Sequence, residues 1–387
     1  MMRILLISPP VDPGKPPTDP EVLRAAFDAA EPFGVGIEEE LMLLDASSFD
    51  LAPRARELMS GLEHDSRFKL ELPAAQIEIA TRPEPSLPAA RAQLLAARAE
   101  LAAAAASQGL RLASAGTHPF AAPLGELNSG ERYERTRAEY GELAHRQLVF
   151  GLHVHVGIGD ADRALAIHDA LRSYLPEISA LAANAPFHDG RDTGLASMRP
   201  TISELLPRQG VPPLLRDWEG YADALRWGAR SGAVPEPRRW WWALRLHPAF
   251  GTVEVRAPDA QSTSAETLAI AAFVHTLVVR LAERHAAGET LEIAPTWRIE
   301  ENRWSANRYG AVGEMADLDT GERQPTAQRI ARLLDELEPV AERLGSAGLL
   351  QDARRLLAAG GGAVAQREIA AERGLDGLVE WLADRFA

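Results

Sequence analysis

The sequence predicts an α+β fold in which a sheet forms an open cup, with helices packed on its outer face. Two observations lead to this fold class. Short strand-like segments alternate along the chain with longer helix-like segments. Several of the strand-like segments also carry charged residues at every second position, whereas parallel strands buried on both faces read as continuous hydrophobic runs. One face of the sheet must therefore be polar, and we expect the functional site on that inner face.

The first half of the chain supplies three strands and one clear helix. Residues 8–20 contain too many prolines for a helix or an interior strand, and we interpret them as a linker. Strand-like patterns follow over Val35–Asp45 and Phe68–Thr81, and a further strand is expected over Leu110–Ala115. The alanine- and leucine-rich stretch Ser86–Gln108 predicts a helix with a serine cap, closed by the glycine that follows it.

The second half continues the alternation of helices and strands. Glu131–Gln147 has a helical pattern, and Leu148–Ile158 alternates strictly at its centre, which predicts a strand. Beyond these we expect helices over 161–185, 216–230 and Ala265–Ala287, one or two strands over Trp241–Ala257, loops over 187–215, and mostly helix from Thr326 onward. No internal linker or repeat is visible. We therefore expect a proline-rich N-terminal segment over 1–32 and a single domain over 33–387 with a helical C-terminal part.

Composition excludes several classes of protein. The 387 residues include no cysteine, which rules out disulfides and thiolate chemistry. The net charge of -14 argues against a nucleic-acid partner, because phosphate binding needs a basic surface. The start lacks the long apolar region of a secretory signal. The apolar stretch Gln93–Gln108 is interrupted by Arg98 and Glu100, so no membrane span is expected.

These observations predict a cytoplasmic protein without a nucleic-acid or membrane partner. The tryptophans at 240–242 would suit a subunit interface or a core strand. A homo-oligomer therefore stays open.

Acidic residues inside apolar strands are the first candidates for a functional site. Residues two apart on a strand share a face, so Glu38 and Glu40 project from one face and Glu39 from the other. Neighbouring carboxylates repel each other unless a cation or a proton lies between them. An acidic triplet is more often solvated surface, but this one is flanked by the apolar runs FGVGI and LMLL. Glu78 lies in a second apolar strand.

Histidines and an arginine add to this set. His153 and His155 share a strand face, as two imidazoles that bind one metal can, although structural histidines are the alternative. Glu254 and Arg256 also share a face, either as a plain ion pair or as a metal ligand beside a phosphate-binding arginine. Oxygen-rich ligand sets suit magnesium or manganese better than zinc.

Divalent ions, carboxylates and arginines together are what phosphoryl transfer from ATP requires. The sequence contains no P-loop and no dinucleotide fingerprint. A nucleotide would therefore be held by metal ions and the cup rather than by a glycine-rich loop.

Seven segments of the chain, taken in order, resemble the type 2 glutamate–cysteine ligases, also called carboxylate–amine ligases. They are GIEEEL, QIEIAT, GTHPF, GLHVHVG, PRQGVPP, WWALRLHPAFGTVEVRAPDAQ and ENRWSANRYG, and the match runs from Phe33 to Gly310. The resemblance implies a glutamine-synthetase-like core with a curved, mainly antiparallel sheet. It also implies a reaction in two steps. The γ-carboxylate of glutamate takes the γ-phosphate of ATP to form an acyl phosphate, and an amine, by default that of cysteine, then displaces phosphate.

The resemblance also implies roles for individual residues and the cofactors ATP and Mg²⁺, with Mn²⁺ as a substitute. The implied metal ligands are Glu38, Glu40, Glu78, His153 and Glu254. Arg256 is similar to a phosphate-stabilising arginine, and Arg199 to an arginine that handles an amino-acid carboxylate. Arg303, Trp304 and Arg308 are expected near the nucleotide. Residues expected to line the site without an assigned role include His155, Arg132, Tyr133 and Arg245.

Two other functions stay open at this stage. One is a ligase of the same fold that joins a different amino acid and amine, because loops such as 187–215 would choose the substrates. The other is a zinc hydrolase built on His153 and His155, which the abundance of glutamates disfavours.

Overall fold

The structure, a computed structural model, describes residues 19–62, 64–234 and 236–386. Its centre is a seven-stranded sheet with the order β2-β3-β1-β5-β9-β8, to which β4 adds by pairing with β1. Every pairing between these strands is antiparallel, which confirms the α+β prediction. The strands are β1 (Val35–Asp45), β2 (Phe68–Leu70), β3 (Gln76–Ala80), β4 (Leu110–Ala113), β5 (Leu152–Gly157), β8 (Leu244–His247) and β9 (Thr252–Val255). Of the expected linker over 8–20, only 19 and 20 fall within the described residues.

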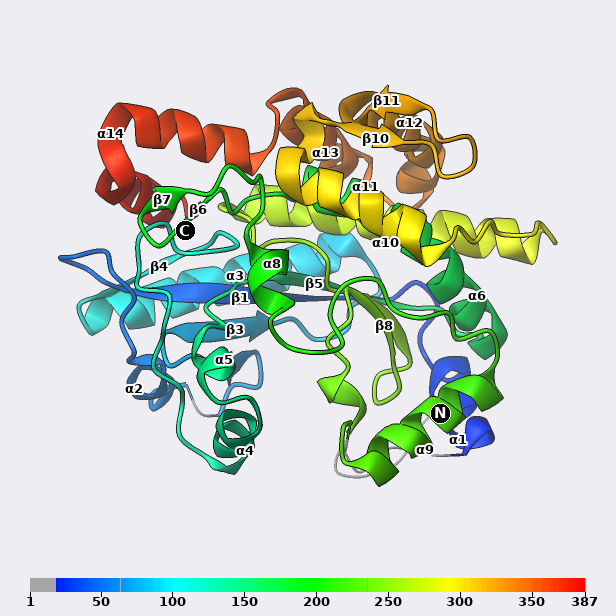
Figure 1. Cartoon of the computed structure of the whole chain (residues 1–387), viewed down its shortest axis with the longest axis horizontal. Helices are drawn as coiled ribbons and strands as arrows, with labels where there is room; N and C mark the ends of the chain where they lie inside the picture. Colours follow the sequence, from blue (N-terminus) through cyan, green and yellow to red (C-terminus); the bar gives the residue numbers. More distant parts are fainter. Residues whose placement is uncertain (1–18, 63, 235, 387) are drawn as a thin grey trace, which may run out of the picture.

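Helices form the rest of the molecule, together with two small hairpins (Figure 1). The hairpins are β6 (Phe187–His188) with β7 (Arg191–Asp192), and β10 (Glu314–Ala316) with β11 (Arg323–Pro325). The helices are α1 (Pro20–Asp28), α2 (Ala55–Met59), α3 (Leu87–Ser107), α4 (Glu131–Tyr140), α5 (Glu142–His145), α6 (Ala161–Leu171), α7 (Leu175–Leu181), α8 (Arg199–Ser203), α9 (Trp218–Ser231), α10 (Ser264–Ala286), α11 (Thr296–Tyr309), α12 (Thr326–Arg343), α13 (Ala347–Ala358) and α14 (Gly362–Asp384).

Helices α3 and α10 cover one face of the sheet and leave the other face to the functional site. Both pack against the central strands and against each other (Figure 1). Strand β1 shows the division between the two faces. Ile37 and Leu41 are fully buried on the helix side, whereas Glu38 and Glu40 are only partly covered on the other side. Since the side chains of a strand alternate between faces, the predicted inner face of the cup is polar.

Helix α10 is the most deeply placed helix of this outer layer. By length and composition alone it is apolar enough to cross a membrane, and 83% of its most apolar window is buried inside the protein. It contacts β5, α3, α6, α12 and α13. The apolar character of α10 is therefore matched by packing on several sides, as in a core helix.

Glu39, on the helix-covered face of the sheet, forms a buried ion pair. Its carboxylate lies among the helices and accepts two hydrogen bonds from Arg98 of α3, at 2.8 Å from Nε and 2.6 Å from Nη2. Thr267 of α10 donates to the same carboxylate. Both charged side chains are 2% exposed or less, and the carbonyl of Phe386 accepts from Arg98 at 3.1 Å. Such a buried pair is tolerated because each charge has a partner and the remaining donors are satisfied.

Three predicted elements are divided in the structure. The segment Phe68–Thr81 forms two strands, β2 and β3, because the chain turns at 71–75 around Pro73. The helix expected over Glu131–Gln147 breaks at Gly141, which has a φ of 56°. The stretch 161–185 forms α6 and α7 with a short 3-10 turn between them.

Helix α1 lies within the segment 1–32, where no helix is predicted. Asp19 caps it by accepting a hydrogen bond from the backbone N–H of Glu21, and Pro20 occupies its first turn, where a missing N–H costs nothing. Leu23 and Phe27 are fully buried, and the helix packs against α6 and α9. Residues 20–28 therefore belong to the packed part of the molecule.

Candidate active site

Three rows of charged and imidazole side chains cross the inner face of the sheet. The strand register places the members of each row directly opposite one another. The first row is Lys69, Glu78 and Glu40, the second is Glu38 and His153, and the third is His155, Glu254 and Arg245. Side chains directly opposite one another on neighbouring strands have Cβ atoms about 5 Å apart. Residues from six strands therefore meet without any loop being needed to bring them together.

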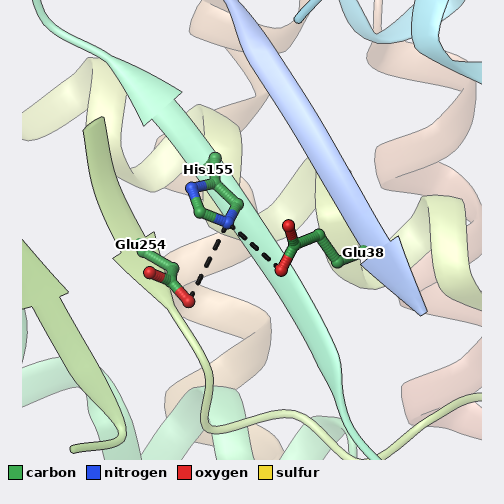
Figure 2. A group of neighbouring side chains, drawn as sticks. All are labelled: Glu38, His155 and Glu254. Carbon is green, nitrogen blue, oxygen red and sulfur yellow. Dashed lines mark ion pairs between the residues drawn. The ribbon is translucent and has the colours of Figure 1, made fainter. Parts of the chain in front are cut away.

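Two groups of these side chains have the geometry of a metal site. Glu38, His155 and Glu254 offer ligand atoms that lie within 4.8 Å of one another. The Nε2 atom of His155 is 3.6 Å from Glu38 Oε2 and 3.8 Å from Glu254 Oε1 (Figure 2). The second group is Glu38, Glu78 and His153, whose ligand atoms also lie within 4.8 Å of one another. Glu38 belongs to both groups, so two ions held here would share one carboxylate.

The donor set fits a divalent cation. Each group supplies two carboxylates and one imidazole, and oxygen-rich sets of this kind suit Mg²⁺ or Mn²⁺. The Nε2 atoms of His153 and His155 are buried and have no hydrogen-bond partner among the described residues. A buried polar atom without a partner is costly, and coordination of an ion would satisfy it. The two histidines lie in different groups, which speaks against a single zinc site built on the H-x-H pair.

The pKa values set the charge of these ligands. Burial opposes the charge of Glu38, but the charge of His155 and a hydrogen bond with His153 hold its pKa well below the ordinary value. Burial, reinforced by the charge of Glu38, raises the pKa of Glu78 to about 8. Burial and the charge of Arg256 lower the pKa of His153 to about 3, so its imidazole is neutral. Neutral imidazole is the form that binds a metal.

Glu254 is held by two arginines as well as facing His155. Its carboxylate accepts hydrogen bonds from Arg245 at 2.5 Å and from Arg256 at 2.6 Å. Burial works against its ionisation, yet the charges of Arg245, His155 and Arg256 keep its pKa well below the ordinary value. Both alternatives that the sequence leaves open for Glu254 and Arg256 are therefore present in the geometry: an ion pair, and a carboxylate within a metal-sized group.

A cavity of about 420 Å³ opens beside these groups. Its walls include Glu40, Arg199, Arg256 and Arg303, all of which the sequence predicts. Arg132 and Tyr133, which the sequence also predicts as lining residues, lie in the wall as well, together with Glu71, Arg239 and Trp241. Both acidic and basic side chains thus line a space large enough for part of a small polar ligand.

Glu40 faces this cavity and lies outside both metal-sized groups. Its carboxylate accepts a hydrogen bond from the backbone N–H of Gly151 at 2.6 Å, and it lies 3.9 Å from Nε2 of His153. Burial raises its pKa to about 7, against the charges of Arg199 and Arg256. The role implied by the resemblance, direct metal binding, stays a prediction for Glu40.

Arg199 lies flat against strand β5 because residue 151 is a glycine. A Cβ atom at Gly151 would come within 2.2 Å of an Nη2 atom of Arg199. The guanidinium donates to the carbonyl oxygens of Arg256 and Ala257. Its Nε is buried without a hydrogen-bond partner in the described part of the chain. The first glycine of GLHVHVG therefore makes room for a cation at the wall of the cavity.

The three candidates on α11 do not all reach the cavity. Arg303 lines it and forms ion pairs with Glu204 and Glu300. Trp304 is 56% exposed, and Arg308 donates to the carbonyl of Gly194; neither lines the cavity. Successive helix residues point about 100° apart, so the neighbour of an inward-facing residue faces away.

Several residues of the site have no assigned role in the sequence prediction. His155 completes a metal-sized group, and Lys69 contacts two of the predicted ligands. The signal for His155 was the strand alternation itself, which places it on the same face as His153. Arg239 ends a short 3-10 turn, and no local pattern indicates it. Trp241 begins the resembling segment WWALRLHPAFGTVEVRAPDAQ, but it lies in the irregular stretch before β8 and had no predicted role.

Comparisons with known proteins agree with this fold. The sequence model of glutamate-cysteine ligase family 2 matches residues 34–379. A glutamate–cysteine ligase of Haloferax volcanii is 37% identical over 368 residues, which cover 92% of this chain and 98% of that protein.

Two solved structures have a similar fold. One is the glutamate–cysteine ligase of Francisella tularensis in complex with AMP, with a TM-score of 0.64 and 15% identity over 91% of this chain and 88% of that chain. The other is a bifunctional glutathione synthetase of Pasteurella multocida, with a TM-score of 0.63 and 14% identity. It covers 95% of this chain, which spans 54% of that protein.

Proposed function

Since the chain belongs to glutamate-cysteine ligase family 2, we propose that it is an ATP-dependent ligase that joins the γ-carboxylate of glutamate to an amine, with cysteine as the default amine. The observation that carries the proposal is the pair of metal-sized groups sharing Glu38, next to a cavity lined by arginines. The relative in Haloferax volcanii is named for this reaction, and the similar structure from Francisella tularensis was solved with a nucleotide bound.

The bond changes of the proposed reaction balance in two steps. A γ-carboxylate oxygen of glutamate attacks the γ-phosphorus of ATP, which forms an acyl phosphate and releases ADP. The amine nitrogen then attacks the acyl carbon, loses a proton and expels phosphate. Phosphoryl transfer needs positioning and charge neutralisation more than covalent chemistry from the protein. The site should therefore supply cations around the phosphates and a fixed place for each carboxylate.

Divalent ions at the two groups would neutralise the phosphate charge of ATP. Glu38, Glu78 and His153 would hold one ion, and Glu38, His155 and Glu254 the other. The neutral imidazole of His153 and the ionised Glu38 already have the protonation states that ion binding requires. Glu78, with a pKa of about 8, and His155, whose pKa is raised, would each release a proton when an ion binds.

The arginines of the cavity would bind the anionic groups of the substrates. Arg256 keeps one guanidinium nitrogen on Glu254 and lines the cavity, so it can meet a phosphoryl group close to the metal ligands. Arg199 has an unpartnered buried Nε and lies between Glu40 and Asp259, which suits it to bind a substrate carboxylate. Arg303, already held by Glu204 and Glu300, also lines the cavity.

The proposal is tested by incubating the purified protein with ATP, MgCl₂, glutamate and a panel of amines and measuring ADP release. ADP release that depends on both glutamate and one amine supports the ligase, and the responding amine identifies the second substrate. ADP release with another amino acid in place of glutamate would point to a ligase for a different pair. Turnover without ATP, or activity that only zinc supports, would contradict the proposal.

Replacing Glu40 with glutamine is expected to reduce ADP release by about 10²-fold or more, as loss of a group that interacts with the reacting charges does. Glutamine keeps an acceptor for the N–H of Gly151 but removes the charge that faces Arg199 and Arg256. The fold should stay intact, as judged by circular dichroism and thermal unfolding. An insoluble or unfolded variant would instead show that Glu40 is needed for structure.

A further inference from the structure

Lys69 lies where a cation bound to the proposed metal ligands would lie. It is on the edge strand β2, directly opposite Glu78 of β3. Its Nζ atom is 2.7 Å from Glu78 Oε1 and 3.3 Å from Glu38 Oε1. These are two of the three ligands in the group Glu38, Glu78 and His153. The ammonium therefore bridges carboxylates of two different strands, as a metal ion would.

The choice of lysine at this position stands out within the chain. Lysine and arginine together number 41 in the sequence, and only Lys15 and Lys69 are lysines. A guanidinium is a flat fork that suits one carboxylate held at two points, as Arg98 holds Glu39. An ammonium is a compact point charge on a flexible stem, and it can occupy a position between two carboxylates.

The contacts of Lys69 also allow its side chain to move away from the two glutamates. Its side chain is 44% exposed, whereas those of Glu78 and Glu38 are 7% and 15% exposed. The hydrogen bonds of its side chain that the structure gives go to these two glutamates alone. A side chain on an edge strand can move into solvent without disturbing the ladder of hydrogen bonds behind it. The two glutamates, in contrast, are fixed by the central strands.

We propose that Lys69 and a divalent ion compete for Glu38 and Glu78, so that Lys69 must withdraw before an ion binds to the group Glu38, Glu78 and His153. The inference rests on the proposed use of divalent ions by these ligands. Two cations that share the same pair of carboxylates repel each other. Lys69 thereby lowers the affinity of this group for the ion and keeps the buried carboxylates neutralised until the ion arrives. It acts as a positioning residue that sets the concentration of divalent ion at which the group fills.

The first test measures Mn²⁺ binding to the full-length protein by electron paramagnetic resonance of the free ion. The variants are Lys69→Met, which keeps length without charge, and Lys15→Met, the matched control at the other lysine. Lys69→Met is expected to bind one Mn²⁺ tighter by about tenfold or more, within the range of coupling between two ligands of one protein. The total number of bound ions should not change, and Lys15→Met should match the wild type.

The second test follows Lys69 itself by NMR. In the Lys15→Met protein, reductive methylation with carbon-13 formaldehyde labels only Lys69 and the N-terminal amine, and methylation keeps the positive charge. The Lys69 resonance should shift during a Mg²⁺ titration, with the concentration dependence of ion binding. This measurement does not depend on whether Lys69→Met folds.

The outcomes separate this inference from the proposed function. Equal Mn²⁺ affinity in the wild type and Lys69→Met, or a Lys69 resonance that does not move while the ions bind, overturns the competition alone. One additional Mn²⁺ in Lys69→Met would mean that Lys69 replaces an ion permanently, which also overturns it. If neither protein binds Mn²⁺, the metal part of the proposed function fails and the competition fails with it.

Discussion

Replacement of Glu38 by glutamine is expected to abolish ATP-dependent turnover, with a loss of about 10³-fold or more in kcat, because a catalytic metal ion contributes several kcal/mol to the transition state. Glu38 is the one residue that belongs to both metal-sized groups. A neutral amide in its place weakens both ion positions at once, whereas loss of Glu78 or Glu254 affects one. Glu38→Gln is therefore expected to be more damaging than a substitution at either of those positions.

Two measurements check this expectation. ADP release should be lost even at high Mg²⁺, and a Mn²⁺ titration should show weaker binding at both positions. Glu57→Gln is the matched control, since Glu57 is an exposed glutamate of α2 whose ion-pair partner among the described residues is Arg54. Glu38→Gln turnover within about tenfold of the wild type, the effect of 1.4 kcal/mol, would show that this carboxylate does not hold the ions.

Replacement of Arg98 by methionine is expected to lower the free energy of unfolding by about 3–5 kcal/mol, the usual result of removing one partner of a buried ion pair. Glu39 is fully buried and would lose two hydrogen bonds and its counter-charge. Methionine fills much of the space of the arginine stem, so the loss reflects mainly the unpaired carboxylate. Urea denaturation gives the free energy directly.

A double variant separates the charge from the packing. Glu39→Leu together with Arg98→Met removes both charges, and apolar replacement of a whole buried pair is often close to neutral. The double variant should therefore be more stable than Arg98→Met alone. Arg146→Met, which breaks a surface pair with Glu142, should change stability by about 1 kcal/mol or less. A double variant less stable than Arg98→Met would contradict this account.

The face on which each glutamate lies could be predicted from the sequence, and the reason is the fixed period of a strand. Glu38 and Glu40 on one face and Glu39 on the other follow from the two-residue repeat, and the structure agrees at all three positions. The same alternation argued against a parallel sheet buried on both faces, and the antiparallel pairing that the family resemblance implied is confirmed.

Breaks within elements could be predicted less well. The turn between β2 and β3 carries Pro73, a residue that seldom lies inside a strand and that could have divided the predicted strand. Gly141 marks the break between α4 and α5 in the same way. Helix α1 lay outside any prediction because its two buried residues, Leu23 and Phe27, follow a proline-rich stretch.

The sequence could not predict which distant segments contact one another in the site. The metal-sized groups follow from strand faces, but their membership depends on which strands are neighbours. Strand order placed Lys69 opposite Glu78, and no local signal in the segment around Lys69 reveals this. Likewise, Arg303 and Trp304 are adjacent in the sequence, yet only Arg303 lines the cavity. A motif match cannot distinguish the two, because the direction of each side chain depends on how α11 docks.

The hydrogen bond from Arg98 to the carbonyl of Phe386 joins residues 288 positions apart. During synthesis, Arg98 leaves the ribosome long before its partner at 386 has been added, since chains grow at about 5–20 residues per second. For that interval the buried environment of Glu39 and Arg98 cannot be complete. A nascent chain that stops short of residue 386 should thus remain a loosely closed intermediate and a preferred client of chaperones and proteases.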